Sequence, residues 1–448
     1  MRRDFYQQLL AWKNQKKRKP LILKGIRQCG KTYGVTAFAR KEFPRFHYVN
    51  FEQSPQLISV FTPDLDPKRI VKELQFHLDT QIDIDHDLLI FDEVQASPIA
   101  LTSLKYFCEQ LPSLALCAAG SLLGLELSNH SFPVGKVEFL PVYPLSFNEF
   151  LEALNDQKSL DFIQQASATT HIPDIVHQHL WRRLLCYFVT GGLPEVVMTF
   201  CEYQEDVFIA FQKVREKQSQ VIATYYADIA KHCGKKNAMH VDRVWRSVPQ
   251  QLMNVQDASA KRFQFSHVVP GIDRYQGLIS AIDWLMMAGL VIKTHINAHA
   301  ELPLLAFRKE SLFKLYLSDV GLLGAMVGLP PATIWQYQYG TYKGYFAENF
   351  VAQEFLCATS EDLFCWQQYR SEIEFLRVID ADIIPIEVKS GRITRAKSLQ
   401  KFIDLYSPPF HVILSGLPLQ IDQHAGRYQL PLYMASQLRS PSILFSKN

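Results

Sequence analysis

The chain has 448 residues, enough for two or three domains, and its 48% hydrophobic and 20% charged residues are ordinary for a globular protein. The net charge of +3 is too small to indicate a nucleic-acid or membrane partner by itself. Eight scattered cysteines without a C-x-x-C pair indicate neither a zinc site nor a disulfide framework. No apolar run is long enough to span a bilayer, and the N-terminus becomes polar too early for a secretory signal. We therefore expect a cytoplasmic protein with reduced thiols and no membrane partner.

Near the N-terminus, residues 25–32 fit the phosphate-binding loop pattern G-x-x-x-x-G-K-[ST], known as Walker A. An apolar run at 21–23 precedes the loop as a strand, and a helix-compatible run at 33–41 follows it. Successive backbone N–H groups of such a loop surround the phosphates of ATP, and the helix N-terminus attracts them. Lys31 would reach the β- and γ-phosphates, and Thr32 would bind Mg²⁺. The predicted nucleotide-binding residues are Gly25, Arg27, Gln28, Cys29, Gly30, Lys31, Thr32 and Tyr33. A glycine turn beside a chance lysine is the alternative.

A second motif argues against chance. Four apolar residues at 88–91 run directly into Asp92 and Glu93, the pattern known as Walker B. A buried strand that ends in acids places charge at the carboxyl edge of a sheet, where open α/β folds bind ligands. Asp92 would hold Mg²⁺ through water, and Glu93 would polarise the attacking water, so that Lys31 and Glu93 are the main predicted catalytic residues. The alternative is a strand that ends at a polar surface.

Another buried strand is predicted at 114–119, after a β-type run at 46–51 and helices at 68–79 and 98–110. A further strand between the two nucleotide motifs is typical of additional-strand P-loop NTPases, so the predicted fold is α/β. The strand ends at Gly120-Ser121. Ser121 resembles the sensor residue that detects the γ-phosphate and would be the third catalytic residue. A serine that caps a helix is an equally good interpretation.

Several blocks together resemble one family. They are the G-x-R-Q-x-G-K-T loop, the block at 89–95, the Gly-Ser pair, the Pro-Leu-Ser-Phe-x-Glu-Phe-Leu block at 144–151, and Tyr187 with residues 191–195. The chain is similar, over nearly its whole length, to the prokaryotic AAA-type ATP-binding proteins that carry a C-terminal domain of unknown function. The family commonly has Gly-Arg where this chain has Gly135-Lys136, and that arginine is a candidate finger for a neighbouring subunit's nucleotide. Lysine is a non-planar substitute, so the source of a trans-acting arginine is open.

The middle of the chain is predicted to be mostly helical over 155–235. From 241 to 307, helical segments are followed by a glycine, an apolar strand from Val291, a polar turn and the apolar run 304–307. This order is typical of a winged helix, and the family resemblance implies the same. Winged helices bind DNA or other proteins. The basic residues that would contact phosphate are Arg243, Arg246, Lys261 and Arg262. A solvated basic face is the alternative.

A second group of candidate residues lies near the C-terminus. Glu348 occupies an apolar stripe of a helix predicted at 344–355, and burying an uncompensated carboxylate is costly, so it needs a partner. Residues 373–376 and 384–389 alternate as strands, which puts Glu387 and Lys389 on one face. Acids on adjacent strands and on a covering helix can together hold Mg²⁺, while the lysine orients a hydroxide for attack on a phosphodiester.

This pattern resembles the restriction-endonuclease-like core, in which an acid and an acid-x-lysine recur, and the family's C-terminal domain resembles the same core. The resemblance implies a nuclease-like site at Glu348, Glu374, Glu387 and Lys389, with the three glutamates as metal ligands. The middle acid is usually aspartate, and the longer Glu374 could displace a ligand from an octahedral Mg²⁺ site. An inert fold with a buried salt bridge, for example between Glu348 and Lys389, is the alternative.

These patterns predict three domains: a P-loop AAA-type ATPase domain with an N-terminal helix at 1–200, a helical and winged-helix-like region at 201–318, and a restriction-endonuclease-like α/β domain at 319–448. The predicted function is Mg²⁺-dependent binding and hydrolysis of ATP, which drives a switch acting on DNA. The alternative is a nucleotide-dependent protein-interaction module with an inert nuclease-like scaffold. The predicted cofactors are ATP and Mg²⁺. Candidate partners are ATP or ADP, DNA, and a second copy or another protein. The sequence leaves the physiological role, the DNA preference and the oligomeric state open.

Overall fold

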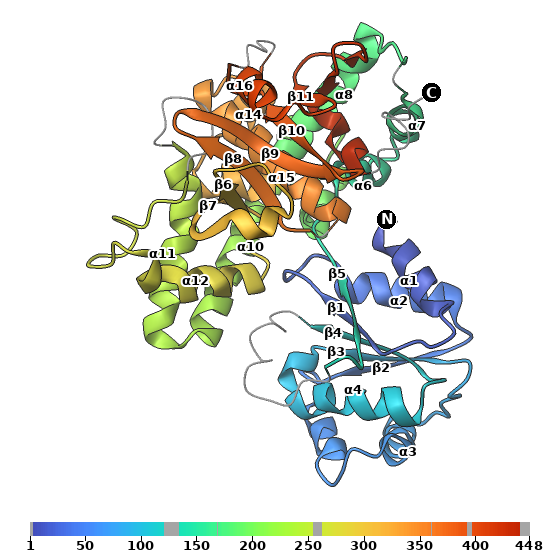
Figure 1. The fold of residues 1–448 in the computed structure, drawn as a ribbon. Helices are drawn as coiled ribbons and strands as arrows, with labels where there is room; N and C mark the ends of the chain where they lie inside the picture. The colour runs from blue at the N-terminus through green and yellow to red at the C-terminus, as the bar shows by residue number, and fades with distance from the viewer. Residues whose placement is uncertain are drawn as a thin grey trace. The chain divides into compact units, whose positions relative to one another are not determined.

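The computed structural model describes residues 3–120, 134–167, 169–253, 262–359, 361–391 and 397–439. The chain divides into two compact units (Figure 1). The first consists of Met1–Tyr143 with Met287–Gly289, and the second of Pro144–Met286 with Leu290–Asn448. Across the described ranges, no helix is both long enough and apolar enough to cross a membrane.

The first unit is built on a five-stranded parallel sheet. Its strands are β1 (Leu21–Lys24), β2 (Phe46–Asn50), β3 (Leu88–Asp92), β4 (Ala115–Gly120) and β5 (Glu138–Pro141). They pair in the order β2-β3-β4-β1-β5, with every neighbouring pair parallel. Strand β4 lies between β1 and β3, which confirms the additional strand between the two nucleotide motifs. Because the strands are parallel, the carboxyl ends of β1 and β3 meet at one edge of the sheet.

Helices cover both sides of this sheet, with α1 and α2 on one side and α3 and α4 on the other (Figure 1). Proline in the first turn and a capping side chain start two of them: Asp66 accepts from Lys68 N before α3, and Ser97 accepts from Ala100 N before α4. The helices of this unit are α1 (Phe5–Lys13), α2 (Lys31–Glu42), α3 (Pro67–Leu78) and α4 (Pro98–Gln110), with 3₁₀ helices η1 (Pro55–Phe61) and η2 (Val94–Ala96).

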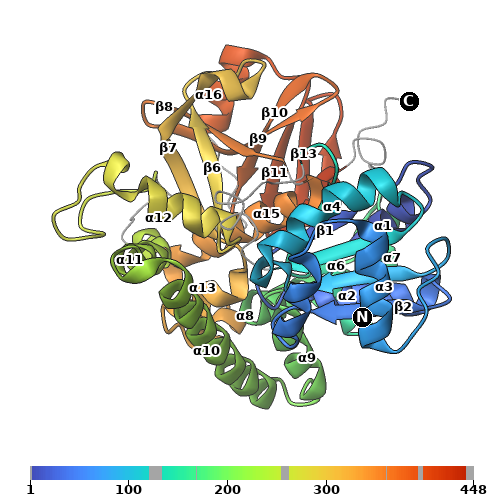
Figure 2. The ribbon, with the colours of Figure 1, turned by 90° about the horizontal axis from the view of Figure 1, so that it is seen from below.

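The second unit contains an eight-stranded mixed sheet in the order β12-β13-β11-β10-β9-β8-β6-β7 (Figure 2). Its strands are β6 (Val291–Asn297), β7 (Arg308–Leu317), β8 (Leu363–Gln368), β9 (Ser371–Ile379), β10 (Asp382–Val388), β11 (His411–Ser415), β12 (Gln420–Asp422) and β13 (Arg427–Pro431).

The strand pair expected of the winged-helix region belongs to this larger sheet. Strands β6 and β7 are antiparallel, and β6 also pairs in parallel with β8. Pairing with β8 satisfies the backbone groups that a free edge of β6 would expose. The sheet therefore runs across the domain boundary predicted between 318 and 319. The run 304–307 is not part of a strand but forms the 3₁₀ helix η3 (Leu304–Phe307) directly before β7.

The segment expected to be mostly helical over 155–235 contains α7 to α10 and the start of α11, and α15 covers the helix predicted at 344–355. The helices of the second unit are α6 (Phe147–Ala153), α7 (Gln157–Gln165), α8 (Asp174–Thr190), α9 (Pro194–Glu202), α10 (Val207–His232), α11 (Gly234–Met253), α12 (Tyr275–Met287), α13 (Val320–Met326), α14 (Pro331–Trp335), α15 (Lys343–Thr359) and α16 (Lys397–Tyr406), with η4 (Gly340–Tyr342) and η5 (Leu432–Arg439).

The blocks at 144–151 and 187–195, which carry part of the family resemblance, hold the second unit together. Tyr187 donates its hydroxyl proton to Leu145 O, and Gly192 N donates to Asp319 Oδ2 over 2.6 Å. Gly191 has φ +73°, and a Cβ there would lie 2.0 Å from Asp319 Oδ1. No larger residue fits at Gly191 without moving the buried Asp319. These motif residues therefore contribute to the packing of this unit.

Candidate functional site

The phosphate-binding loop joins β1 to α2, as the sequence predicts. Two of its residues take left-handed backbone conformations, Gln28 with φ +62° and Gly30 with φ +89°. A Cβ on Gly25 would lie 2.1 Å from Val142 O, so only glycine fits where the loop leaves the strand. Local backbone geometry thus folds the loop tightly at the carboxyl edge of the sheet, in front of the N-terminus of α2.

Lys31 is the first residue of α2, and its side chain turns back over the loop. Its ammonium group donates to Gly25 O and Ile26 O, each over 2.9 Å, and the residue is only 8% exposed. A lysine ammonium has three protons to donate and no acceptor. Backbone carbonyls are neutral acceptors, so an anionic phosphate at the helix N-terminus would be a stronger partner for Lys31.

A buried arginine that the sequence analysis did not single out supports the loop. Arg3 donates to Cys29 O over 2.8 Å and to Tyr143 O over 2.6 Å. The guanidinium thereby links the loop to the residue two positions after β5. An N-terminal Met-Arg-Arg carries no motif, so only the tertiary structure assigns Arg3 this positioning role.

The residues predicted to hold Mg²⁺ lie together. Thr32 Oγ1 donates to Asp92 Oδ2 over 2.9 Å, and Tyr48 donates its hydroxyl proton to the same oxygen over 2.5 Å. Glu93 N donates to the other oxygen, Asp92 Oδ1, over 3.0 Å. Hydroxyl and carboxylate oxygens beside a phosphate loop are the donors that Mg²⁺ prefers. The residues therefore fit a Mg²⁺ ion in chemistry, with Thr32 and Asp92 to hold it.

Glu93 follows β3 with a left-handed backbone, φ +50°, and its side chain accepts from the amide of Gln95. Burial raises the pKa of Glu93 and the neighbouring Asp92 raises it further, while the Gln95 hydrogen bond and Lys31 act in the opposite direction. A higher pKa makes the carboxylate a stronger base toward a water proton. The strained backbone at this position fits a functional role, because such outliers gather at sites of chemistry.

Strand β2 supplies two polar residues that the sequence analysis missed. Asn50 lies opposite Asp92 in the sheet register, and its amide donates to the Tyr48 hydroxyl over 3.2 Å. Burial, followed by the hydrogen bond to Asp92, raises the pKa of Tyr48 to about 12. Tyr48 is therefore a proton donor that fixes the Asp92 carboxylate. Tyr48 and Asn50 alternate with His47 and Val49 along the predicted strand 46–51, and that alternation near the carboxyl edge could have identified them.

The other predicted nucleotide-site residues lie at the rim or outside the site. Arg27 forms an ion pair with Glu52 over 3.8 Å, and Tyr33 is exposed. Lys136 pairs over 3.0 Å with Glu109 on α4 of its own unit. Ser121 lies outside the described residues, as does Lys261 of the basic group 243–262.

The predicted nuclease-like residues lie in the second unit, in an acid–lysine cluster on β7, α15, β9 and β10. Glu348 on α15 is buried and accepts from the Tyr316 hydroxyl over 2.9 Å. Lys314 Nζ lies 3.4 Å from Glu348 Oε2 and also contacts Glu372 Oε1. Glu348 therefore has a lysine partner, as its burial requires, but that partner is Lys314 of β7, a residue that no sequence motif marked.

The other two predicted acids share the predicted lysine. Lys389 Nζ lies 2.5 Å from Glu387 Oε1 and 3.8 Å from Glu374 Oε1. The backbone N–H of Val388 donates to Glu374 Oε2 over 3.0 Å. Burial, and next the charge of Glu387, raise the pKa of Glu374 to about 8 despite the opposing lysine.

The acids of this cluster are balanced by lysines. No group of three or more His, Cys, Asp or Glu side chains that could hold a metal ion occurs among the residues whose placement is described. The glutamates are paired with the ammonium groups of Lys314, which is buried, and Lys389, which is partly exposed. The charge of Glu348 and that of Glu372 outweigh desolvation and hold the pKa of Lys314 well above its usual value. Lys314 thus supplies positive charge to Glu348 and Glu372.

Two local predictions for this region also change. Helix α15 is buried all round from Gly344 to Phe355 rather than along one stripe. In β9, Ile373 and Leu376 both pack into the apolar cluster under α16, although strict alternation would put them on opposite faces. The pairing with β8 shows why, because β9 has one extra residue between the partners of Phe364 and Trp366, a β-bulge.

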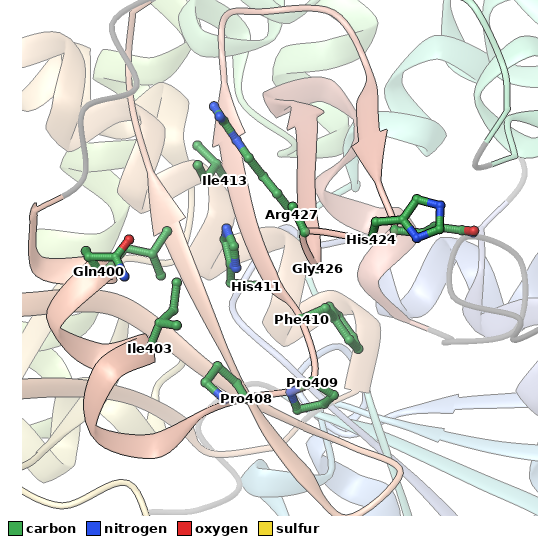
Figure 3. A pocket seen from close by; sticks show the side chains of 13 residues that line it. Gln400, Ile403, Pro408, Pro409, Phe410, His411, Ile413, His424, Gly426 and Arg427 are labelled. Carbon is green, nitrogen blue, oxygen red and sulfur yellow. The ribbon is translucent and has the colours of Figure 1, made fainter.

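Two other features of the second unit lie apart from this cluster. On α11, Arg246 pairs with Asp242 over 2.9 Å and lies 4.0 Å from the centre of the Tyr226 ring. A cavity of about 750 Å³ lies between α16, β11 and the turn before β13. Figure 3 shows His411, Gln400 and Arg427 among its lining side chains. Neither feature contains a residue of the two predicted active sites.

Comparison with protein families places three matches on the chain. Residues 17–151 match the family described as AAA domain. Residues 182–333 and 343–431 match two families described as domains of unknown function. The first match supports an AAA-type nucleotide-binding domain that includes both nucleotide motifs. The other two cover the predicted winged-helix and nuclease-like regions without describing an activity.

The chain is also similar to solved structures at low sequence identity. One is the Walker-type ATPase PABY2304 of Pyrococcus abyssi, with 15% identity, coverage of 73% of this chain and 95% of that chain, and a TM-score of 0.46. The Aeropyrum pernix ORC1 protein in complex with DNA has 14% identity, coverage of 73% and 91%, and a TM-score of 0.31. AMPPCP-bound DnaA from Aquifex aeolicus has 13% identity, coverage of 62% and 85%, and a TM-score of 0.27. No curated protein matches the chain.

Proposed function

We propose that the chain is a Mg²⁺-dependent, AAA-type ATPase. The observation that carries the proposal is the meeting of Thr32 with Asp92 at the sheet edge, beside the loop that Lys31 closes. A phosphate loop alone would support binding. A hydroxyl and a carboxylate placed for Mg²⁺, followed by the basic Glu93, support hydrolysis as well.

Each residue has a separate role in the proposed reaction. Lys31 exchanges its two carbonyl partners for oxygens of the β- and γ-phosphates. Thr32 and Asp92 hold Mg²⁺, which neutralises phosphate charge when it is bound. Glu93 accepts a proton from the attacking water as the water oxygen bonds to the γ-phosphorus and the bond to the β-phosphate oxygen breaks. The products are ADP and inorganic phosphate.

The test is a comparison of ATP binding and turnover in purified full-length variants. Lys31→Ala should lose binding, because it removes the group that contacts two phosphates. Glu93→Gln should bind Mg²⁺·ATP as the wild type does but lose about 100-fold or more in kcat, since a general base typically contributes that much. Glu73→Gln, which changes an exposed acid on α3, is the matched control. Wild-type turnover in Glu93→Gln would show that Glu93 is not the base.

We further propose that ATP drives a switch that acts on DNA through the second unit. This proposal rests on a single chain that contains a nucleotide unit and a separate unit with the winged-helix-like and nuclease-like regions. Hydrogen exchange of the full chain with and without a non-hydrolysable ATP analogue tests it. A switch predicts changed protection within residues 144–439 as well as near the loop at 25–32. Changes confined to the first unit would contradict it.

A second candidate function is favoured by one observation in the acid–lysine cluster. Because Lys314 neutralises Glu348 and Glu372, the nuclease-like region fits a catalytically inert scaffold within a nucleotide-dependent interaction module. An inert scaffold predicts no Mn²⁺-dependent cleavage of DNA or RNA and no rise of Tm with Mn²⁺, both in the wild type and in Glu374→Asp. Cleavage by Glu374→Asp that Glu387→Ala abolishes would instead support a metal-dependent nuclease.

A further inference from the structure

An exposed aromatic ring lies at the tip of a hairpin in the second unit. Strands β8 and β9 pair through Gln368 and Ser371, so Tyr369 and Arg370 form a two-residue turn between them. Tyr369 is 90% exposed, and Arg370 is exposed as well. Solvent-exposed tyrosine rings at hairpin tips bury little area against their own chain, so packing does not account for this one.

The backbone at this position adds a second observation. Tyr369 has φ +56°, a left-handed conformation at the first position of a two-residue hairpin turn. Glycine is the residue that such a position favours, because a side chain there is strained. A large aromatic side chain thus occupies a backbone position that glycine would adopt without strain. Backbone strain of this kind gathers at binding sites.

A lysine of α16 lies over the ring. The Lys401 ammonium lies 5.2 Å from the centre of the Tyr369 ring and 5.9 Å from that of Trp366. Lys397 is four residues before Lys401 and so lies on the same side of α16. The tip therefore combines one free aromatic face with Arg370 and the two lysines. An exposed cation–π contact is weak and does not by itself explain a strained tyrosine.

The tip also lies at the same end of the sheet as part of the acid–lysine cluster. Strands β9 and β10 are antiparallel, with Phe375 opposite Ile386, so the end of β10 lies beside the start of β9. Lys389, which follows β10 directly, keeps 29% of its side chain exposed there. Lys389 is already paired with Glu387 and Glu374, so the charges that remain for a ligand at the tip are those of Arg370 and the lysines of α16.

We propose that the β8–β9 hairpin tip binds single-stranded nucleic acid, with a base stacked on Tyr369 and phosphates contacting Arg370 and Lys401. Stacking platforms beside basic side chains are the general means by which proteins bind single strands without sequence preference. A duplex keeps its bases stacked on each other, so it cannot offer a free base to the ring. The proposal concerns binding and holds whether or not the acid–lysine cluster cleaves.

The test measures fluorescence anisotropy of labelled oligo(dT) and oligo(rU) with the full chain. The wild type should bind, Tyr369→Phe should bind equally, and Tyr369→Gly should bind about tenfold or more weakly, the loss expected of one stacked base. Tyr369→Gly should nevertheless keep or raise Tm, because glycine relieves the turn. A merely structural tyrosine would show the reverse, a lower Tm with unchanged binding.

Charge variants and a matched control complete the test. Arg370→Gln and Lys401→Gln should each lower the slope of log Kd against log salt concentration by roughly 0.7, the value for one phosphate contact on a single strand. Phe76→Ala removes an equally exposed ring, 91% exposed, from α3 of the first unit and should change nothing. The proposal is overturned if the wild type binds neither oligonucleotide, or if Tyr369→Gly binds as the wild type does. Tyr369-dependent binding to anionic lipid vesicles, without binding to oligonucleotides, would also overturn it.

Discussion

The nucleotide site of the first unit and the acid–lysine cluster of the second use the same residue types and compensate their charges differently. In the first, Lys31 rests on two backbone carbonyls, and Asp92 accepts from two hydroxyl groups. In the second, Lys314 and Lys389 contact carboxylates directly. Neutral partners can be exchanged for a phosphate and a metal ion at little cost, whereas a paired buried charge cannot be released without desolvation cost. Lysines and acids near each other therefore do not by themselves indicate a metal site.

The largest effect is expected on the stability of the acid–lysine cluster in the second unit. Lys314→Met should lower the free energy of unfolding by about 3–5 kcal/mol, because it leaves Glu348 and Glu372 buried or partly buried without their cation. Denaturant unfolding measures this. Adding Glu348→Gln to Lys314→Met should recover part of the loss, since it removes one uncompensated charge. A loss below about 1 kcal/mol would mean that the cluster is not a compensated ion-pair network.

The next effect addresses the rigidity of the nucleotide loop. Gly25→Ala places a Cβ 2.1 Å from Val142 O, so the loop must move. We expect a loss of ATP binding together with about 1–3 kcal/mol of stability, as for other overpacked positions. Gly391→Ala is the control, because a Cβ there meets nothing within 4 Å. If Gly25→Ala binds ATP normally, the loop does not need its close approach to Val142.

The stability of the second unit should also depend on pH through Glu374 in the acid–lysine cluster. The pKa of Glu374 is about 8 in the folded chain, against roughly 4.3 for an unfolded glutamate. Between these values the folded chain binds more protons than the unfolded chain, so the stability contributed by Glu374 falls as pH rises. The free energy of unfolding of Glu374→Gln, relative to that of the wild type, should rise by at least about 1 kcal/mol between pH 5 and pH 8. This change is the equivalent of roughly one pKa unit. If the free energies of unfolding of the two proteins changed in parallel with pH, the raised pKa of Glu374 would be contradicted.

The smallest expected effect tests how Asp92 is held. Tyr48→Phe removes the hydroxyl that donates to Asp92 and should cost about 1 kcal/mol of stability, the usual net value of one hydrogen bond. Because Thr32 and the N–H of Glu93 still contact Asp92, ATP affinity should change far less than in Lys31→Ala. Tyr369→Phe, at a 90% exposed ring of the second unit, is the control. A loss of ATP binding in Tyr48→Phe would make Tyr48 part of the binding site itself.

The sequence by itself determined the loop and the strand ends that form the proposed nucleotide site. The G-x-x-x-x-G-K-T spacing, the apolar run before Asp92 and Glu93, and the further strand at 114–119 together predicted the loop, the two acids and the strand that lies between β1 and β3. These features are local, because a strand, a turn and a helix follow one another along the chain. Parallel pairing of such strands then leaves the carboxyl ends at one edge, whatever the rest of the chain does.

Only the tertiary structure decided what compensates the acids of the second unit. Glu348 lies on α15, whereas Lys314 comes from β7, a strand that the sequence assigned to another domain. Their contact exists because β6 and β7 extend the C-terminal sheet, and the bulge in β9 alters which side chains of that strand share a face. Period-two alternation says which residues can meet across adjacent strands, but not which strand becomes the neighbour. The partner of a buried charge is set by that long-range pairing, so sequence spacing could not reveal it.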